Sequence, residues 1–446
     1  MNLYISGISG TGMGPLALMA KAAGHTVFGS DRAKGAIAPE LEAAGIEYFT
    51  GDQDGSYLAE KMQKPGIDWF IYTSALPADH PELLLAKEKG IRASKRDELI
   101  AELISALGLK MTAVAGTHGK TTTTAMLVWT VLNLTDPSGS PLLPSSYLVG
   151  TTLGFAPSGS YKENDCFFIY EADEYDRNFL HFNPWLALIT YVSYDHPDIY
   201  PTEADYKAAF AQFESQSENI LFGTPAAAPA DTAFLTDAGR TCDTVAHTDP
   251  RITISGAARR EDATTAFYAI KKMLAAQRGL CPGDTRYDVP DERIIDILNA
   301  FPGVGRRFEK LCDGVYTDYA HHPEEVATTI EMAREEAAKT GKRGVVAVYQ
   351  PHQNTRQHEV RHLYPHAFDG ADRLYWLPTY LTRENESLAI LTPADFIRDL
   401  SIKDRAAAAE LNDSLADALK RLQDEGYLIL LMTAGPADGW LRKVFR

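Results

Sequence analysis

Short apolar runs alternate with helix-like patterns along most of the chain. Residues 3–6 (LYIS) predict a strand that ends at glycines, and residues 14–23 predict a helix that Gly24 closes. Residues 25–28 and 69–73 predict further strands. This alternation is typical of right-handed βαβ units, so we expect a mainly parallel sheet.

The same order of elements begins twice more. Residues 111–115 predict a strand that leads into a glycine loop and then into a helix from about Thr121. Residues 314–317 predict a strand followed by Asp318 and by a helix that opens near Pro323. The sequence therefore predicts an α/β fold of three domains, with boundaries near residues 108 and 300, that is 1–108, 109–299 and 300–446.

Composition narrows the functional classes. The 446 residues carry a net charge of −17, which argues against bulk electrostatic binding to nucleic acid or to an anionic membrane. We expect neither a membrane span nor a signal peptide, because the chain has no long apolar run and its first residues (MNLYISG) carry no basic segment. The cysteines lie far apart without a CxxC pair, which indicates reduced thiols in a cytoplasmic protein: Cys166, Cys242, Cys281 and Cys312.

A glycine loop between the strand at 111–115 and the next helix reads GTHGKTTT over residues 116–123. Backbone N–H groups in such a loop converge on phosphate oxygens, and the helix N-terminus adds positive potential. Lys120 would neutralise the β- and γ-phosphates and Thr121 would bind Mg²⁺. The alternative is a tight turn with a surface lysine, but the GKT triplet between a strand and a helix favours a nucleoside triphosphate.

Acidic and imidazole side chains follow two more predicted strands. Glu171 ends the strand at 166–170, and Asp195-His196 comes shortly after the strand at 186–190. Carboxylates at the carboxyl edge of a parallel sheet face the ligand crevice, and Mg²⁺ prefers oxygen ligands. Glu171 with Thr121 is therefore a coherent Mg²⁺ pair, whereas His196 is a less usual Mg²⁺ ligand.

Glycines also follow the first strand, at positions 7, 10, 12 and 14, and Asp31 ends the second strand. The arrangement is similar to a dinucleotide fingerprint, but the GxGxxG pattern fails because residue 15 is proline. An NAD-dependent dehydrogenase, a loop for another nucleotide diphosphate and a purely structural turn all remain open from this segment.

Taken together, the motifs GISGTGM, GSD, TSA, GTHGKTTTT, EADEYD, DHPDIY, GVGRRFE, DYAHHPEE and QPHQNTR resemble the Mur ligase family, in order and across essentially the whole chain. The resemblance implies three domains. A Rossmann-like N-terminal domain would bind the UDP part of the substrate, a central P-loop ATPase domain would bind ATP, and a Rossmann-like C-terminal domain would bring the amino acid.

The resemblance also implies an activity: ATP-dependent joining of L-alanine to the lactyl carboxylate of UDP-N-acetylmuramate through an acyl phosphate, giving ADP and phosphate. This is a step of cytoplasmic peptidoglycan precursor synthesis. The implied cofactors are ATP and Mg²⁺, and the implied partners are the UDP-sugar and L-alanine, with no nucleic acid or membrane and a monomer or weak homodimer as the assembly.

Site residues carry over by position in the matching motifs. The resemblance gives catalytic roles to Lys120, Glu171, His196 and Arg307, and metal binding to Thr121, Glu171 and His196. It places the nucleotide against Gly116, Thr117, His118, Gly119, Lys120, Thr121, Thr122, Asp262, Arg306 and Asp318. It places the UDP-sugar and the amino acid against Gly10, Thr11, Gly12, Met13, Ser30, Asp31, Thr73, Ser74, Ala75, His321, His322 and Arg356.

The chain departs from the family pattern at several positions. Tyr191 and Ser193 stand where the family often has Asn and Glu, Gln353 replaces an arginine, and Asp262 replaces an adenine-contacting Asn. Two further alternatives follow: a related ligase that recycles a tripeptide onto the same UDP-sugar, and a non-catalytic module that senses UDP-sugars.

Overall fold

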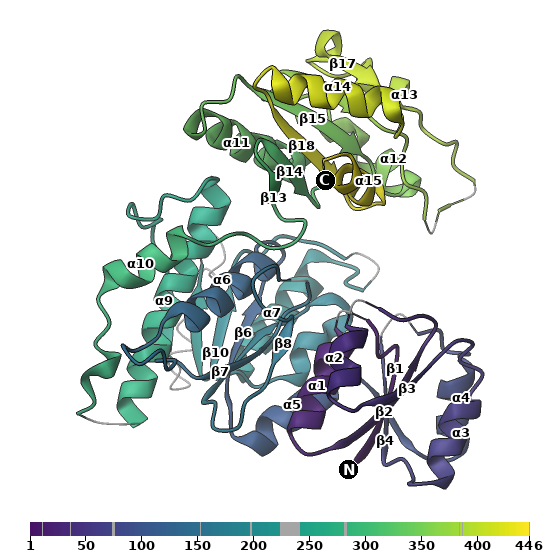
Figure 1. Cartoon of the computed structure of the whole chain (residues 1–446), viewed down its shortest axis with the longest axis vertical. Helices are drawn as coiled ribbons and strands as arrows, with labels where there is room; N and C mark the ends of the chain where they lie inside the picture. Colours follow the sequence, from purple (N-terminus) through teal and green to yellow (C-terminus); the bar gives the residue numbers. More distant parts are fainter. Residues whose placement is uncertain are drawn as a thin grey trace. The chain divides into compact units, whose positions relative to one another are not determined.

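The computed structural model describes residues 1–10, 12–35, 37–73, 76–151, 153–196, 199–223, 241–280, 283–382, 384–385 and 387–445. Among the residues singled out above, Thr11, Ser74, Ala75 and Cys281 lie outside these ranges. The chain forms two compact units, Met1–Ile252 with Glu261–Phe301, and Thr253–Arg260 with Pro302–Arg446. Three mainly parallel sheets confirm the predicted α/β class (Figure 1). The boundaries at 108 and 300 remain predictions.

The first sheet has the strand order β3-β2-β1-β4-β5 and is wholly parallel. Its strands are β1 (Asn2–Ser6), β2 (Thr26–Asp31), β3 (Glu47–Thr50), β4 (Trp69–Tyr72) and β5 (Arg92–Lys95). Its helices are α1 (Met13–Ala22), α2 (Ala38–Ala43), α3 (Ser56–Gln63), α4 (Pro81–Glu88) and α5 (Arg96–Leu107). The strand order reverses between β1 and β4, the position where open α/β sheets bind ligands.

Side chains of β1 alternate between two apolar layers. Leu3 and Ile5 pack with residues of α1, α2 and α5, whereas Tyr4 packs with Leu58 of α3 and Leu83 of α4. Figure 1 shows the same two helical layers on the two faces of this sheet. Because both faces are covered, the central strands β1 and β4 read as nearly continuous apolar runs, which explains why the sequence predicted them.

A buried carboxylate joins the strand ends of this sheet. Glu82 of α4 is 1% exposed and accepts hydrogen bonds from the hydroxyls of Tyr4 and Ser6, each at 2.7 Å. The Ser30 hydroxyl donates a third bond, at 2.8 Å. Ser30, which the resemblance assigned to the substrate, is thus buried and its hydroxyl is bound within the protein.

We expect Glu82→Ala to lower the unfolding free energy by about 3 kcal/mol, because three buried hydroxyls lose their acceptor and a cavity forms. Glu88→Gln is the matched control, since Glu88 lies exposed at the end of the same helix. Thermal melting of the full chain measures both variants. A Glu82→Ala variant that melts at the same temperature as the wild type and the control would contradict this role of Glu82.

The second sheet has the order β12-β11-β10-β6-β9-β7-β8, parallel except for the β7–β8 pair. Its strands are β6 (Lys110–Ala115), β7 (Ser145–Leu148), β8 (Gly159–Ser160), β9 (Phe167–Glu171), β10 (Leu186–Ile189), β11 (Asn219–Phe222) and β12 (Thr241–Thr244). The α-helices are α6 (Lys120–Asn133), α7 (Glu203–Gln216), α9 (Ala257–Leu280) and α10 (Asp291–Asn299), and the 3-10 helices are η1 (Tyr175–His181) and η2 (Thr285–Tyr287). One buried apolar cluster runs through this part and the first sheet, including Leu3, Leu99, Met111 and Phe210.

The third sheet, in the second unit, has the order β13-β14-β18-β15-β16-β17, parallel except for β13–β14. Its strands are β13 (Glu309–Cys312), β14 (Val315–Asp318), β15 (Val345–Gln350), β16 (Arg373–Trp376), β17 (Ala406–Ala408) and β18 (Leu428–Thr433). The α-helices are α11 (Pro323–Lys339), α12 (Asn354–Val360), α13 (Pro393–Ile397), α14 (Asp413–Asp424) and α15 (Ala437–Val444), with 3-10 helices η3 (Arg361–Leu363) and η4 (Lys403–Arg405). Two apolar layers cover its two faces.

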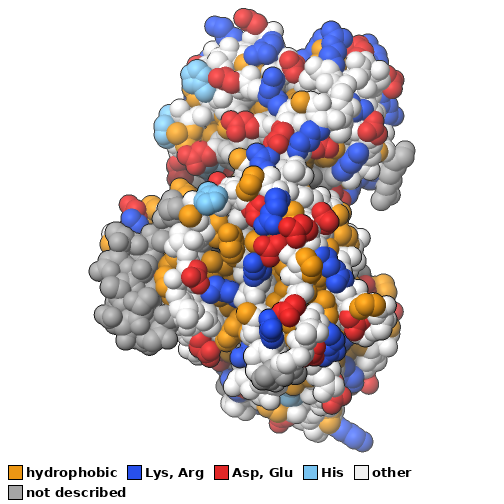
Figure 2. Space-filling view, turned by 90° about the vertical axis from the view of Figure 1, so that its left-hand side faces the viewer, with side chains coloured by type: hydrophobic (Ala, Val, Ile, Leu, Met, Phe, Trp, Pro, Cys, Tyr) orange, Lys and Arg blue, Asp and Glu red, His pale blue; other side chains and the backbone are white. Residues whose placement is uncertain are grey.

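The surface carries both signs of charge. On the face drawn in Figure 2, Lys and Arg side chains are interspersed with Asp and Glu side chains. Within the described ranges, none of the helices combines the length and the apolar character that a membrane span needs.

Candidate functional site

The loop between β6 and α6 requires glycine at two positions. Gly116 and Gly119 have φ angles of +133° and +83°, which side chains rarely adopt. A Cβ atom at Gly116 would lie 2.3 Å from Thr190 Oγ1, and one at Gly119 would lie 2.4 Å from Asp262 Oδ1. The backbone therefore approaches its neighbours closely, and the loop ends at the N-terminus of a 14-residue helix. Such a loop is a ready site for phosphate oxygens.

Lys120, the first residue of α6, folds back over this loop. Its Nζ donates to the Gly116 carbonyl oxygen at 2.5 Å and lies 2.9 and 2.8 Å from the two carboxylate oxygens of Glu174. His196 Nε2 lies 3.5 Å from the same carboxylate. The structure thus brings Lys120 and His196 together through Glu174, which is 1% exposed. Glu174 was not among the residues predicted to form the site.

These contacts shift the titration of the acid and the imidazole. Burial raises the pKa of Glu174, but the bond to His196 and the charge of Lys120 outweigh burial and hold the pKa below its ordinary value. Burial lowers the pKa of His196, and the bond to Glu174 with the charge of Asp195 raises it further than burial lowers it. Glu174 is therefore held as a carboxylate beside a cation.

Thr121 and Glu171 form a second contact beside Lys120. The Thr121 hydroxyl donates to Glu171 Oε1 at 2.5 Å, and the Gly150 N–H donates to Oε2 at 3.2 Å. Two hard oxygen ligands from α6 and β9 thus lie side by side, the donor type that Mg²⁺ takes together with phosphate oxygens and water. Among the described residues, no group of three or more His, Cys, Asp and Glu side chains forms a complete metal cage.

The segment after β10 is tied to the glycine loop. The Thr117 hydroxyl bonds to both the N–H (2.9 Å) and the carbonyl oxygen (2.8 Å) of Ser193. Because Ser193 uses backbone atoms, its departure from the family pattern leaves this contact intact. The ring of Tyr191 lies nearly parallel to that of His118, with centroids 6.3 Å apart. Thr122, the remaining predicted loop residue, is half-buried in the first turn of α6.

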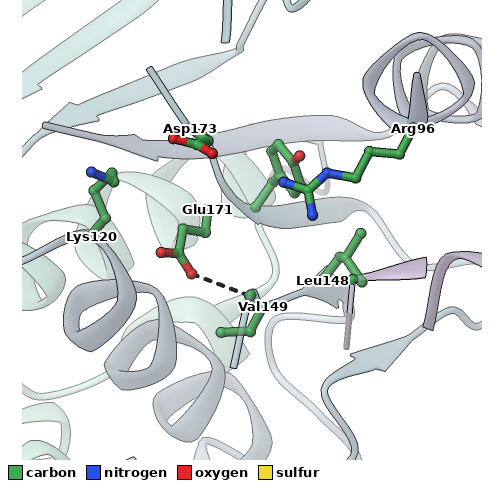
Figure 3. A pocket seen from close by; sticks show the side chains of 9 residues that line it. Arg96, Lys120, Leu148, Val149, Glu171 and Asp173 are labelled. Atoms are coloured by element: carbon green, nitrogen blue, oxygen red, sulfur yellow. Dashed lines mark hydrogen bonds between the residues drawn. The ribbon is translucent and has the colours of Figure 1, made fainter. Parts of the chain in front are cut away.

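A cavity of about 230 Å³ lies beside these residues. It is lined by Gly12, Arg96, Lys120, Leu148, Val149, Gly150, Tyr170, Glu171 and Asp173. Figure 3 shows Arg96 extending toward it, with Lys120, Glu171 and Asp173 around it. Arg96 and Asp173 were not among the residues predicted to form the site. The available signal for Arg96 was its position directly after β5, at the carboxyl edge of the first sheet.

The glycine loop after β1 is held by backbone and carboxylate bonds. Gly10 donates its N–H to the Gly7 carbonyl oxygen at 3.0 Å, and its own carbonyl oxygen accepts from Met13 N at 3.2 Å. Asp31 accepts from Ser9 N at 2.8 Å, which fixes the loop from β2. The Met13 side chain is buried in the core.

Other predicted substrate residues of the first unit differ in how they are placed. Thr73 lies beside this loop, since a Cβ at Gly7 would lie 3.3 Å from its methyl group. Gly12 lines the cavity and Ser30 is buried. The substrate roles of all these residues remain predictions.

In the second unit, two arginines stack on one tyrosine. The guanidinium carbons of Arg306 and Arg307 lie 4.7 and 5.2 Å from the centre of the Tyr319 ring. Asp318, predicted at the nucleotide, accepts backbone bonds from Phe308 N (2.6 Å) and Ala320 N (2.7 Å). Burial raises the pKa of Asp318, against the charge of Arg307 and these two bonds. The carboxylate thus holds the turn after β14, and its role at the nucleotide remains a prediction.

The predicted amino-acid residues lie near the same strand end. His322 Nδ1 accepts from Glu324 N at 3.4 Å and caps helix α11. His321 Nδ1 lies 3.1 Å from the Tyr319 carbonyl oxygen. Burial and then the charge of Arg356 lower the pKa of His321, against the opposing charge of Glu325. The charge of Arg356 therefore acts on His321, and His322 caps the helix. The roles of these three residues at the amino acid remain predictions.

The chain is similar to known proteins along most of its length. Family models match in three blocks: "Mur ligase family, catalytic domain" over residues 2–107, "Mur ligase middle domain" over 114–235 and "Mur ligase, glutamate ligase domain" over 306–435. A UDP-N-acetylmuramate–L-alanine ligase of Pelodictyon phaeoclathratiforme is 32% identical across 97% of this chain and 92% of its own. The ligase of the same name from Chlorobium phaeovibrioides is 30% identical across 100% and 97%.

Solved structures show the same fold. The UDP-N-acetylmuramate-alanine ligase of Thermotoga maritima has a TM-score of 0.70 at 21% identity and covers 100% of this chain and 98% of its own. A murein peptide ligase of Psychrobacter arcticus has a TM-score of 0.58 at 23% identity, with the same coverage.

Proposed function

Because the chain belongs to the Mur ligase family, we propose that it uses ATP to join L-alanine to the lactyl carboxylate of UDP-N-acetylmuramate, giving ADP and phosphate. The observation that carries this proposal is the meeting of Lys120 with the Thr121–Glu171 pair beside one cavity. The relatives named for L-alanine, which match nearly end to end, favour alanine over the tripeptide. The match over residues 2–107 accounts for the N-terminal glycines without a dehydrogenase.

The first half-reaction needs positioning and charge neutralisation. The substrate carboxylate attacks the γ-phosphate of ATP, and the transferred phosphoryl group carries its charge on three oxygens. Loop N–H groups from Gly116 onward and the Lys120 ammonium would stabilise that charge. Glu174 keeps Lys120 beside the loop at 2.9 Å before substrate arrives. The product is an acyl phosphate, whose carbonyl the amine of L-alanine then attacks.

The donor set fits Mg²⁺. Thr121 and Glu171 supply a hydroxyl and a carboxylate whose oxygens lie 2.5 Å apart, and His196 Nε2 lies 3.5 Å from Glu174. Bound Mg²⁺ would neutralise phosphate charge during transfer. Thr121 and Glu171 would hold it, whereas His196 would have to leave Glu174 to act as a ligand.

The amine half-reaction belongs to the second unit in this proposal. Arg307 and Arg356 supply positive charge near His321, and burial together with these charges favours the neutral imidazole. A neutral imidazole can accept a proton from an ammonium group, which must lose one before it attacks a carbonyl. We therefore place L-alanine beside His321, Arg307 and Arg356.

A coupled phosphate-release assay tests the function. Full-length protein with UDP-N-acetylmuramate and Mg-ATP is offered L-alanine, L-serine, glycine or the L-Ala–D-Glu–diaminopimelate tripeptide. We expect L-alanine to give the highest kcat/KM. If only the tripeptide supports turnover, the function is peptide recycling and not the joining of L-alanine. If none of the four acceptors supports turnover, the ligase assignment is overturned.

A further inference from the structure

Arg96 brings a cation from the first sheet to the cavity that Lys120 and Glu171 line. It is the first residue of α5, directly after β5, and its side chain is 28% exposed. Asp173 and Glu171 face the same cavity from the segment that ends β9 (Figure 3). The cavity is therefore lined by Arg96, from the part of the chain predicted to bind the UDP-sugar, and by Lys120 and Glu171, from the part predicted to bind ATP.

The backbone at Gly12 lies directly against this arginine. Gly12 has a φ angle of −93°, which any residue can adopt, so backbone strain does not require glycine here. A Cβ at Gly12 would lie 2.4 Å from Arg96 Nη1. The guanidinium thus packs directly on the backbone of the loop after β1, and a side chain at position 12 would displace the end of the Arg96 side chain.

The guanidinium has donors to spare. Within the described part of the chain, the one ion-pair partner recorded for Arg96 is Asp97, whose carboxylate lies 3.6 Å from Nε. Asp97 also accepts a bond from the Tyr170 hydroxyl at 2.8 Å. Lys120 differs, because Glu174 already holds it at 2.8 Å. A partly buried arginine whose terminal nitrogens lie at a cavity is suited to a carboxylate or phosphate group that accepts two parallel bonds.

We propose that Arg96 binds an oxyanion of the UDP-sugar in this cavity, either the pyrophosphate or the lactyl carboxylate. The inference rests on the proposed function, since it takes the UDP-sugar as substrate. A carboxylate that approaches the γ-phosphate is repelled by it, and a fixed cation on the sugar side reduces that repulsion. Arg96 would therefore position the acceptor in addition to binding it.

Isothermal titration of Arg96→Gln and Arg96→Lys tests this role with three ligands. UDP has the uridine and the diphosphate, UDP-N-acetylglucosamine adds the sugar, and UDP-N-acetylmuramate adds the lactyl carboxylate. We expect Arg96→Gln to weaken binding of UDP-N-acetylmuramate about tenfold or more, and Arg96→Lys to weaken it less, because the charge remains while the fork is lost. An equal loss for all three ligands assigns Arg96 to the pyrophosphate, and a loss confined to UDP-N-acetylmuramate assigns it to the carboxylate.

Two controls separate binding from folding. Arg286→Gln changes an arginine that is 57% exposed and paired with Asp284, and should leave all affinities unchanged. Mg-ATP affinity and the melting temperature of the Arg96 variants should match the wild type. Affinities within twofold of wild type for all three UDP compounds, or a parallel loss of Mg-ATP binding, would overturn the inference alone. Wild-type protein that binds none of the three would overturn the proposed function with it.

Discussion

Lys120→Ala is expected to reduce phosphate release about 10³-fold while leaving the affinity for UDP-N-acetylmuramate nearly unchanged. The ammonium is the cation that lies over the loop, 2.5 Å from the Gly116 carbonyl oxygen, and the loss of one preorganised charge contact at a transition state costs roughly 10²–10³ in kcat. Phosphate release measures turnover, and calorimetry with the UDP-sugar measures binding. Unchanged turnover would contradict the assignment of the loop to ATP.

Because Lys120 and Glu174 form a buried ion pair, a second variant is needed to separate catalysis from folding. Lys120→Ala leaves Glu174 buried without its cation, which by itself destabilises a fold. The double variant Lys120→Met with Glu174→Gln removes both charges, so we expect it to recover melting temperature without recovering turnover. Recovery of both would make the role of Lys120 structural. Lys207→Ala is the matched control, because Lys207 is 66% exposed on α7 and pairs with Glu203.

The central strands could be predicted because burial on both faces makes them continuous apolar runs. β6, β9 and β10 read KMTAVA, FFIYE and LALI, and nearly every residue is buried. The edge strands carry no such signal. β12 reads TCDT and is mostly exposed, and β17 reads AAA. Pairing with a neighbouring strand holds these segments in the sheet, and pairing leaves little trace in sequence.

The residues of the candidate site also differ in whether the sequence reveals them. Lys120 and Thr121 belong to one local loop motif, and Glu171 follows a recognisable strand, so residue type and spacing identify them. Glu174 and Arg96 function through contacts with residues more than 50 positions away, which spacing does not reveal. The two backbone N–H groups that the Asp318 carboxylate binds were likewise not evident from its motif, and its role at the nucleotide remains a prediction.

Glu171→Gln is expected to lower kcat about 10²-fold at saturating Mg²⁺ and to raise the Mg²⁺ concentration needed for half-maximal rate. The amide keeps the shape of the side chain but loses the negative charge, and a neutral oxygen holds a hard divalent cation less well than a carboxylate does. Mg²⁺ titrations of phosphate release at fixed ATP measure both quantities. Glu163→Gln is the matched control, since Glu163 lies exposed just before β9.

Thr121 variants determine whether the pair acts as one unit. Thr121→Ser keeps the hydroxyl that lies 2.5 Å from Glu171 Oε1, whereas Thr121→Val removes it at nearly constant volume. If both oxygens bind one ion, Thr121→Val should shift the Mg²⁺ titration in the same direction as Glu171→Gln, and the double variant should lose less than the sum of the two free-energy changes. Thr121→Ser should stay near wild type. Strictly additive losses, or a Mg²⁺ titration that Glu171→Gln leaves unmoved, would exclude this pair as the metal site.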